Sequence, residues 1–442
     1  MAIDLTPEQR EMGKANYART VEGLTRRGFM KSLAVAGASV AAVSPAVYFG
    51  YKSMAGRPVK AALIGGGDEG GVLVGEHNRE YLQFVAVCDI RPSNMERIFE
   101  GDPKVPLRRG FKKVYNKDAD KIKKFDTYEG LMEELRKNKD IEAIVIALPL
   151  VMHAKAAIDA MKIGKERGKP IHVLTEKLMA WNIKQCKQMI RTAKECNSLL
   201  SVGHQRHYSM LYAHATEIVN AGVLGDIRHI RALWHRNFTW PFRADPKADL
   251  VKDVTQPTFR DGWFPPITHQ DYDALANKTD MLKKFGFDNV EQLIRWRLYQ
   301  ATGGGLMAEL GSHQLDACSI FLGHVHPLAV SGVGTRSFFG PKRNDRDIDD
   351  HVFATYEFPG KNHAKDKHDV VVVTYSSIST NQFENYGECV TGDRGTMVVE
   401  KEATVMLYPE TEPGKVKTQP RGTEVGVSAS GKDKPVLETG ST

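Results

Sequence analysis

The sequence predicts an α/β protein: a doubly wound parallel sheet near the N-terminus, followed by an α+β domain built on a large, mostly antiparallel sheet. Apolar strand-like runs alternate with helix-like segments between residues 59 and 203, and a glycine-rich turn follows the first run. After residue 227, strand-like runs follow one another without long helices between them. Strand–helix alternation is typical of parallel sheets, and consecutive strands favour antiparallel ones. A chain of 442 residues is long enough for two such domains.

The composition is that of a soluble globular protein, with 41% hydrophobic and 26% charged residues. The net charge is +7, and the densest basic run, 104–113, is interrupted by Pro and Gly and lacks interleaved aromatic residues. We therefore expect a solvated loop there rather than a nucleic-acid site. The five cysteines have no CxxC spacing, so they indicate neither a disulfide framework nor zinc, and no ligand set for another metal is apparent.

Residues 1–57 have the form of an export leader. The segment Thr25–Lys31 (TRRGFMK) precedes a weakly apolar stretch from Ser32 to Phe49. Paired arginines before a modest hydrophobic run are typical of a twin-arginine signal, and the run is short of the roughly 20 apolar residues that span a bilayer. We predict export to the periplasm, with cleavage near Ser44-Pro45-Ala46 or retention as a membrane tether. A surface amphipathic helix is the alternative.

The first predicted strand, Val59 to Ile64, ends in the segment GGGDEG, which fits the pattern GxGxxG. Gly65 would permit the tight turn, Gly67 would let the backbone approach a pyrophosphate, and Gly70 would let the following helix pack closely on the strand. The helix N-terminus favours the phosphate charge. This arrangement predicts a dinucleotide-binding Rossmann domain over residues 58–204.

Asp89 follows the second predicted strand, Phe84 to Cys88, and stands 24 residues after Gly65. That is close to the usual distance for the acid that holds the ribose hydroxyls. A carboxylate at this place repels a 2′-phosphate, so NAD is favoured as the cofactor. Arg91 nearby leaves NADP open, and a turn-forming Asp is the alternative role for Asp89.

Four further residues follow later strands of the predicted parallel sheet. Because ligands gather at the carboxyl ends of parallel strands, we expect Pro149, His153, Glu176 and Lys177 to line the cofactor cleft. His153 could equally cap the next helix, and Lys177 could be a surface lysine. The predicted strands are 141–148, 171–175 and 199–203, and the predicted helices are 128–137, 154–163 and 183–196.

The chain resembles the Gfo/Idh/MocA oxidoreductases at several motifs. They are the Gly65 turn, the strand end Ala86–Asp89, Pro149 with His153 four residues on, Glu176-Lys177, and the segments 203–206 (GHQR), 222–225 (GVLG) and 303–316 (GGGLMAELGSHQLD). The long block joined to the Glu-Lys pair is the specific part of the match. The chain departs from the family pattern twice, with Leu178 in place of the usual proline and Glu309 in place of the usual aspartate.

The resemblance implies hydride transfer between a nicotinamide cofactor and a sugar, polyol or inositol. It also implies that the second domain has an open antiparallel sheet, which the family often uses for dimer or tetramer contacts. We therefore expect a homodimer or homotetramer, with a small sugar or glycoside as the substrate.

The second domain is expected over residues 205–408. Residues 239–290 are rich in Trp, Pro and Phe without a clear period, which predicts a lid or rim near the site. Residues 409–442 are predicted to be a flexible tail. The strands are expected at 227–236, 328–335, 351–358, 370–378, 388–391, 396–399 and 404–407, with helices at 208–221 and 311–322 and a hairpin turn at 392–395.

Oxidation of a secondary alcohol needs a base for the hydroxyl proton and a place for the developing alkoxide charge. Lys177 is predicted to hold the substrate oxygen or accept its proton, and His313 is predicted to be the better base because its pKa needs little tuning. Glu309, four residues before His313, could orient the ring or bind a sugar hydroxyl. Arg206, His235 and Arg297 are candidates for contacts with sugar hydroxyls, with structural ion pairs as the alternative.

These expectations combine into a hypothesis for function. An exported enzyme has no free pool of NAD to exchange with, so a redox-neutral cycle on a tightly held nucleotide is favoured. It could be sugar–sugar oxidoreduction, epimerisation, or glycoside cleavage through a transient ketone. The alternatives are an ordinary cytosolic NAD-dependent sugar dehydrogenase and a non-catalytic sugar-binding protein.

Overall fold

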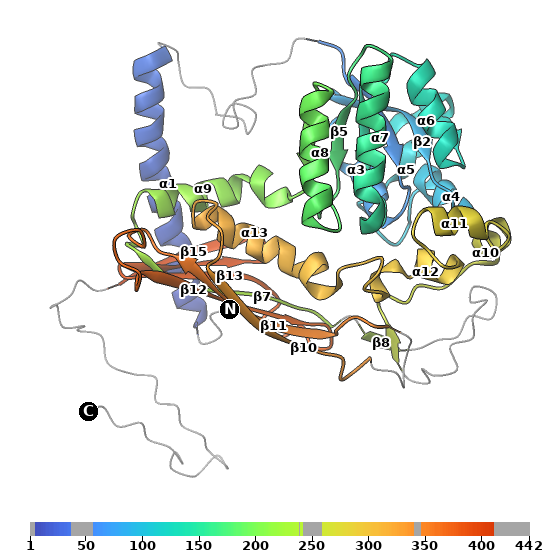
Figure 1. Cartoon of the computed structure of the whole chain (residues 1–442). Coiled ribbons are helices and arrows are strands. Elements are labelled where there is room, and N and C mark those ends of the chain that lie inside the picture. Colours follow the sequence, from blue (N-terminus) through green and yellow to red (C-terminus); the bar gives the residue numbers. More distant parts are fainter. Residues whose placement is uncertain (1–4, 37–55, 238, 242–258, 340–345, 411–442) are drawn as a thin grey trace.

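The computed structural model describes residues 5–36, 56–237, 239–241, 259–339 and 346–410. In Figure 1 a parallel sheet with helices on both faces lies above a broad second sheet, whose upper face is covered by two helices. The expected α/β architecture, with a parallel sheet followed by a mostly antiparallel one, is confirmed. The candidate cleavage segment 44–46, the tail from residue 411 and part of the predicted lid, 242–258, lie outside the described residues.

The first sheet has six parallel strands in the order β3-β2-β1-β4-β5-β6. The strand Lys123–Phe125 was not expected, because its two exposed lysines carry no apolar signal. The strands are β1 (Val59–Ile64), β2 (Leu82–Cys88), β3 (Lys123–Phe125), β4 (Ala143–Ile146), β5 (His172–Thr175) and β6 (Leu200–Val202). The order reverses at β1, so the carboxyl ends of β1 and β4 flank a switch point where ligands bind in such sheets.

Helices cover both faces of this sheet and bury an apolar core on each. Leu131, Ile144 and Met161 belong to one core, and Leu63 and Phe111 to the other. Two helices begin at the side-chain caps Thr127 and Asn182, as polar residues before an apolar period predict. The helices are α3 (Asp68–Glu76), α4 (Pro92–Glu100), α5 (Gly110–Tyr115), α6 (Tyr128–Lys137), α7 (His153–Glu166) and α8 (Ile183–Glu195), with short helices η1 (Asn116–Lys121) and η2 (Leu150–Met152).

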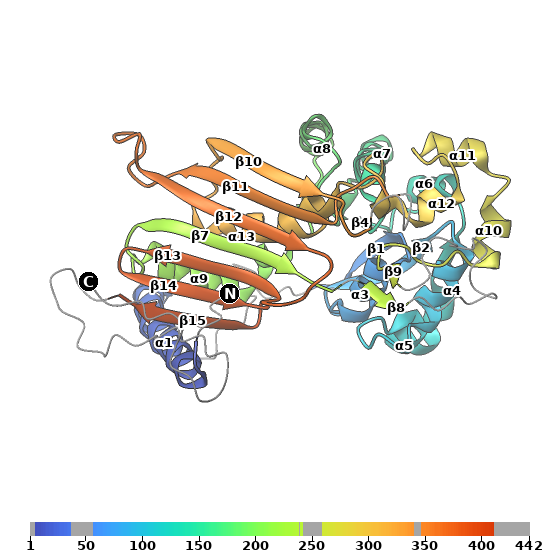
Figure 2. The ribbon, with the colours of Figure 1, turned by 90° about the horizontal axis from the view of Figure 1, so that it is seen from below.

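The second sheet has seven strands in the order β10-β11-β12-β7-β13-β14-β15. All its pairs are antiparallel except β7 with β12, which is parallel. Figure 2 shows this sheet from its open face. The strands are β7 (Ile227–His235), β10 (Ala329–Thr335), β11 (His351–Pro359), β12 (Val370–Ile378), β13 (Tyr386–Gly392), β14 (Gly395–Glu400) and β15 (Thr404–Pro409).

Two helices, α9 (Met210–Asn220) and α13 (Ser312–Phe321), cover the other face of the second sheet. Their apolar residues pack against alternate residues of the strands, for example Ile218 and Phe321 with Val373 and Val399. A single π-helical turn, η5 (Met307–Gly311), leads directly into α13. Such turns are rare and often occur at functional sites. Two short helices, η3 (Gln205–Tyr208) and η4 (Trp296–Leu298), flank this region.

The segment after β7 packs against the first domain. Its apolar side chains join the core of the parallel sheet, and the rings of Tyr128 and Phe285 lie 5.3 Å apart. Arg91 and Asp271 form an ion pair of 2.9 Å between the two parts. In its described residues, the segment therefore packs against the first domain as part of the folded core. Its elements are β8 (Thr239–Pro241), β9 (Phe259–Asp261), α10 (His269–Leu275), α11 (Thr279–Lys284) and α12 (Val290–Ile294).

The N-terminal segment differs from expectation. Residues 1–57 were set apart from the folded domains, yet α1 (Pro7–Ala36) is a long helix whose first part packs against β15 and α9. The sequence did not indicate this because the contact surface on α1 is mixed rather than apolar. In the described parts of the chain, no helix is both long and apolar enough to cross a membrane.

Candidate active site

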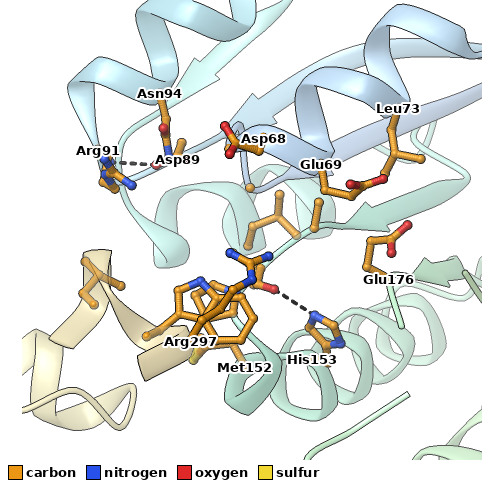
Figure 3. Close-up of a pocket in the computed structure, with 18 of the residues that line it drawn as sticks. Asp68, Glu69, Leu73, Asp89, Arg91, Asn94, Met152, His153, Glu176 and Arg297 are labelled. Carbon is orange, nitrogen blue, oxygen red and sulfur yellow. Dashed lines mark hydrogen bonds between the residues drawn. The ribbon is translucent and has the colours of Figure 1, made fainter. Parts of the chain in front are cut away.

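A cavity of about 1300 Å³ connects the glycine turn of the first domain to the start of α13 in the second. Figure 3 shows part of it, with Asp68 and Glu69 at the start of α3 and Arg297 on the facing side. The cavity brings together most of the residues predicted to form the site, namely Gly65, Gly67, Asp89, Arg91, Pro149, His153, Glu176, Lys177, Arg297, Glu309 and His313.

The glycines of the turn serve two different purposes. Gly65 has φ +100°, and a Cβ placed there would lie 2.1 Å from the carbonyl oxygen of Ala147. A Cβ on Gly70 would lie 2.0 Å from the carbonyl oxygen of Gly65, so Gly70 does not line the cavity but allows the turn to close. A Cβ on Gly67 would meet nothing nearer than 3.8 Å. Gly67 therefore faces open space beside the first turn of α3, where a pyrophosphate fits.

The carboxylate of Asp89 is held by three donors at the end of β2. It accepts hydrogen bonds from the backbone N–H of Gly66 (2.7 Å), the backbone N–H of Arg91 (2.8 Å) and the amide of Asn94 (3.1 Å). Burial raises the pKa of Asp89, and these donors oppose the rise. A carboxylate so oriented has further lone pairs for ribose hydroxyls.

Arg91 does not offer a site for a 2′-phosphate. Its guanidinium donates to Asp271 through Nε (3.0 Å) and Nη2 (2.9 Å), and Asp271 is fully buried. Arg91, the basic group that left NADP open, is therefore already paired with Asp271 of the segment that follows β7. The geometry of this end of the cavity fits NAD.

Acidic side chains lie along the same rim. Asp68 is neutralised by Arg97 (2.8 Å) and Arg108 (3.2 Å). Burial raises the pKa of Glu176 to about 7, and the negative charge of Glu69 adds to the rise. A carboxyl group that is partly protonated near neutral pH can donate as well as accept a hydrogen bond.

His153 joins two loops at the strand ends rather than pointing freely into the cleft. Its ring nitrogens lie 2.8 Å from the carbonyl oxygen of Leu148 and 2.7 Å from that of Leu178. The ring thereby ties the loop containing Pro149 to the loop containing Lys177. The Lys177–Leu178 peptide bond is cis, at the position where Leu178 replaces the expected proline.

Lys177 and Glu309 meet where the two domains face each other. The Lys177 ammonium donates to the backbone oxygen of Glu309 (2.8 Å) and lies 3.9 Å from its carboxylate. Arg297 donates to the same carboxylate through Nε (2.9 Å). Burial alone would raise the pKa of Glu309, but Arg297 and Lys177 outweigh it and hold that pKa at about 2. Glu309 is therefore a carboxylate that positions two cations rather than the ring of His313.

The imidazole of His313 lines the cavity, and its Nδ1 lies 3.1 Å from Oε1 of Gln205. Donation from Nδ1 to Gln205 leaves Nε2 as an acceptor. Burial, followed by the charges of Lys177 and Arg206, lowers the pKa of His313 to about 2. The expectation that this pKa needs little tuning is wrong, because burial and then the surrounding cations disfavour the imidazolium.

This shift makes folding sensitive to acid through one residue. The unfolded chain protonates His313 below about pH 6.5 and the folded protein does not, so this contribution to stability is lost as the pH falls through 6.5. Between pH 7.5 and 5.5, we expect the wild type to lose about 1 kcal/mol more than His313→Gln, allowing for partial solvent screening. Urea unfolding at both pH values measures the difference, and equal losses would contradict the shifted pKa.

Arg206 and His235, predicted as contacts for sugar hydroxyls, do not line the cavity. Arg206 is 1% exposed and binds Glu388, Glu402 and the backbone oxygen of His313. The ring of His235 lies between Ser376 Oγ (2.8 Å) and the backbone oxygen of Phe383 (3.0 Å) on the second sheet. A buried guanidinium needs carboxylates and a strand alternates its side chains between faces, so both positions are structural.

Replacing Arg206 by Met should therefore lower stability rather than substrate affinity. The buried carboxylate of Glu388 would lose its cation, which costs about 3 kcal/mol, or roughly 6–10 °C in Tm. Arg228→Met is the matched control, since Arg228 is half exposed and its ion pairs contribute at most about 1 kcal/mol. Thermal unfolding of both variants tests this, and an equal Tm for the two would contradict it.

Several cavity residues were not anticipated. Gln205 lies inside the GHQR segment that carried the family resemblance, so that motif could have pointed to it. The ring centroid of Trp234 lies 5.1 Å from that of His313. Trp234 and Arg236 had no signal beyond their place in the predicted strand 227–236. Asp316, three residues after His313, accepts a hydrogen bond from His207 (2.8 Å).

The family is identified by two matches. Residues 59–204 match the model of the oxidoreductase family with an NAD-binding Rossmann fold, and residues 283–398 match that of the GFO/IDH/MocA C-terminal domain. The chain belongs to the Gfo/Idh/MocA oxidoreductase family. Its first domain is an NAD-binding Rossmann domain, and the cofactor is NAD.

Curated relatives match parts of the chain. A family 109 glycosyl hydrolase of Shewanella sp. (strain MR-4) is 23% identical over 244 residues, covering 50% of this chain and 48% of that protein. A 1-carboxy-3-chloro-3,4-dihydroxycyclohexa-1,5-diene dehydrogenase of Comamonas testosteroni is 33% identical over 117 residues, covering 26% of this chain and 28% of that protein. The chain thus spans about half or less of these relatives.

Solved structures share the fold. An inositol dehydrogenase homologue of Azotobacter vinelandii, complexed with NAD+, has a TM-score of 0.54 at 16% identity, covering 82% of this chain and 76% of that one. The WlbA dehydrogenase of Bordetella pertussis, complexed with NADH and UDP-GlcNAcA, has a TM-score of 0.52 at 16% identity, covering 81% and 79%. At these identities the likeness concerns the fold alone.

Proposed function

We propose that the protein oxidises a secondary alcohol of a sugar, polyol or glycoside by hydride transfer to NAD. The observation that carries this proposal is the single cavity that joins the glycine turn and Asp89 to Lys177, Glu309 and His313. NAD supplies the hydride acceptor. The side chains at the far end of the cavity supply the groups that bind and deprotonate a hydroxyl.

Lys177 is proposed to hold the reacting oxygen. Its ammonium has three donors, and only one is fixed by the backbone oxygen of Glu309. The remaining N–H groups can face a substrate hydroxyl, and the positive charge stabilises the alkoxide that develops as the proton leaves. Glu309, which is itself held by Arg297, keeps this lysine in place.

His313 is proposed to accept a hydrogen bond from the reacting hydroxyl through its neutral ring. The same cations that lower the pKa of His313 also lower the pKa of a hydroxyl bound among them. The charged surroundings thus favour proton loss, and the proton passes to Nε2 of His313 as the hydride leaves the neighbouring carbon. This role differs from that of a strong base.

We further propose that the cycle is redox-neutral and takes place after twin-arginine export, with retention by a membrane tether or release into the periplasm. The nucleotide then stays bound, and hydride returns to the same sugar or to a second one. Mass spectrometry of the purified protein after mild denaturation should find NAD at near one equivalent, and cell fractionation should place the protein outside the cytosol. Nucleotide-free protein would contradict the closed cycle, and a cytosolic location would favour an ordinary dehydrogenase.

Glycoside cleavage is the second candidate, and the matches to family 109 glycosyl hydrolases favour it. Oxidation of one sugar carbon would acidify the neighbouring C–H and permit elimination of the aglycone, water would then add to the double bond that this leaves, and the hydride would finally return to the ketone. A panel of free sugars and aryl glycosides, with absorbance of the bound nicotinamide and release of the aglycone both recorded, separates the two candidates. Binding of a sugar without either signal would indicate a non-catalytic protein.

A homodimer or homotetramer is also proposed. The edge strand β10 and its neighbour β11 expose apolar side chains, with Val330 62%, Val333 63% and Phe353 44% exposed. Exposed apolar side chains that gather at one sheet edge often mark an interface between subunits. Light scattering coupled to gel filtration gives the subunit number, and a monomer at micromolar concentration would contradict the proposal.

A further inference from the structure

Among the described residues, the strand β15 ends the order of the second sheet and pairs on one side only, with β14. Figures 1 and 2 both show α1 lying across this edge of the sheet. The strand has the apolar sequence TVMLYP, and Val405, Met406 and Leu407 are buried. An unprotected edge strand of this kind is a site for pairing with another chain.

Polar contacts fasten α1 to that edge. Arg10 pairs with Glu400 at 3.0 Å, next to the end of β14. The amide of Asn16 donates to the backbone oxygen of Leu407 (3.1 Å), and the hydroxyl of Tyr408 donates to the backbone oxygen of Gln9 (3.2 Å). The helix thus makes hydrogen bonds with the backbone and side chains of the edge strand itself.

The packing between α1 and β15 is close. Gly13 is buried, and a Cβ on it would lie 2.4 Å from Tyr408 Oη and 2.9 Å from Met406 Cβ. Tyr17 and Val21 pack against the core between the sheet and α9. Burial raises the pKa of Tyr17 to about 12.

These contacts lie on one side of the helix. Positions 10, 13, 17 and 21 recur at intervals of three and four residues, which places them on a single face. Met12, Ala15 and Arg19 on the opposite face are exposed. Residues 7–23 therefore fit the edge as one surface, with glycine at the point of nearest approach.

We propose that residues 7–23 are an intramolecular cap on the β15 edge, so that the segment ahead of Arg26-Arg27 is a structural part of the folded protein. Since α1 continues through the arginine pair to Ala36, that pair is carried on a helix anchored only when β15 has formed. The position of the arginine pair therefore depends on whether β15, the last strand of the sheet, has folded. It also covers an edge that would otherwise accept a second copy of the chain.

The test uses hydrogen exchange of the full-length protein and a matched pair of glycine variants. Gly13→Leu places a side chain against Tyr408 and Met406, whereas Gly23→Leu adds the same side chain to the same helix where a Cβ meets nothing within 4 Å. Both substitutions raise helix propensity alike, so that effect cancels. Amides of residues 10–21 should exchange slowly in the wild type and in Gly23→Leu, and at least about tenfold faster in Gly13→Leu.

A gentler variant guards against misfolding of Gly13→Leu. Asn16→Ala removes the bond to Leu407 without adding bulk and should speed exchange at residues 10–21 by about fivefold, while β13 and β14 remain protected. Exchange of residues 10–21 in the wild type at the rate of an unfolded peptide would overturn the proposal, as would equal rates in Gly13→Leu and Gly23→Leu. The measurement needs neither nucleotide nor substrate, so it is independent of the proposed enzymatic function.

Discussion

Replacing Lys177 by Met is expected to slow reduction of the bound NAD by roughly 10³-fold while leaving the nucleotide in place. The variant keeps the length of the side chain but removes the charge that would stabilise the alkoxide. It also removes the donor to the backbone oxygen of Glu309. Single-turnover absorbance at the nicotinamide band, with the sugar that gives the largest signal in the panel, measures the rate.

Two controls show whether a slower rate reflects the loss of the Lys177 charge itself. Lys184→Met changes an exposed lysine at the start of α8 and should leave the rate unchanged. The nucleotide content of Lys177→Met, measured by mass spectrometry, should match the wild type, because the glycine turn and Asp89 are untouched. A Lys177→Met protein that still reduces its NAD within about fivefold of the wild type would remove Lys177 from the mechanism.

The second large effect is expected at the glycine turn. Gly65→Ala forces a Cβ against the backbone oxygen of Ala147 in a left-handed conformation, which should cost about 4 kcal/mol of stability. The glycine turn after β1 would be pushed away from the chain that follows β4, so NAD binding should be lost as well. Thermal unfolding and nucleotide content of the purified variant give both readouts.

Gly67→Ala separates folding from binding in the same turn. Its Cβ meets no atom within 3.8 Å, so the variant should fold with nearly the wild-type Tm. The added methyl group would stand where the pyrophosphate approaches, and NAD affinity should fall by about tenfold or more. If Gly67→Ala kept full nucleotide affinity, the pyrophosphate would have to lie elsewhere than at the start of α3.

Much of the fold could be predicted because local patterns agreed with the tertiary arrangement. The strand Val59–Ile64, the helix Tyr128–Lys137 and the strand Val370–Ile378 have the bounds that their apolar periods predicted. The strand Lys123–Phe125 and the parallel pairing of β7 with β12 were not predictable, since the first has almost no apolar residue and the second depends on which strands become neighbours.

The nucleotide end of the site was predictable for a related reason. Gly65, Gly67 and Asp89 lie close in sequence to one strand–turn–helix unit, so their spacing reflects their geometry. Arg206 and His235 had no such unit. Whether an arginine after a strand meets a ligand or a buried carboxylate depends on Glu388, 182 residues away.

By itself, the sequence determined the two sheets and the dinucleotide turn. It also indicated that Lys177, after one strand, and His313, in a distant block, belong to the same site. Each of these features is encoded by residues within one or two elements. Only the tertiary structure decided the electrostatics. Lys177, Arg206, Arg236 and Arg297 gather around Glu309 and His313. Asp271 binds Arg91, and the helix that carries the arginine pair covers β15. The physical reason is that charges and surfaces act through distance in space, and spacing along the chain does not record that distance.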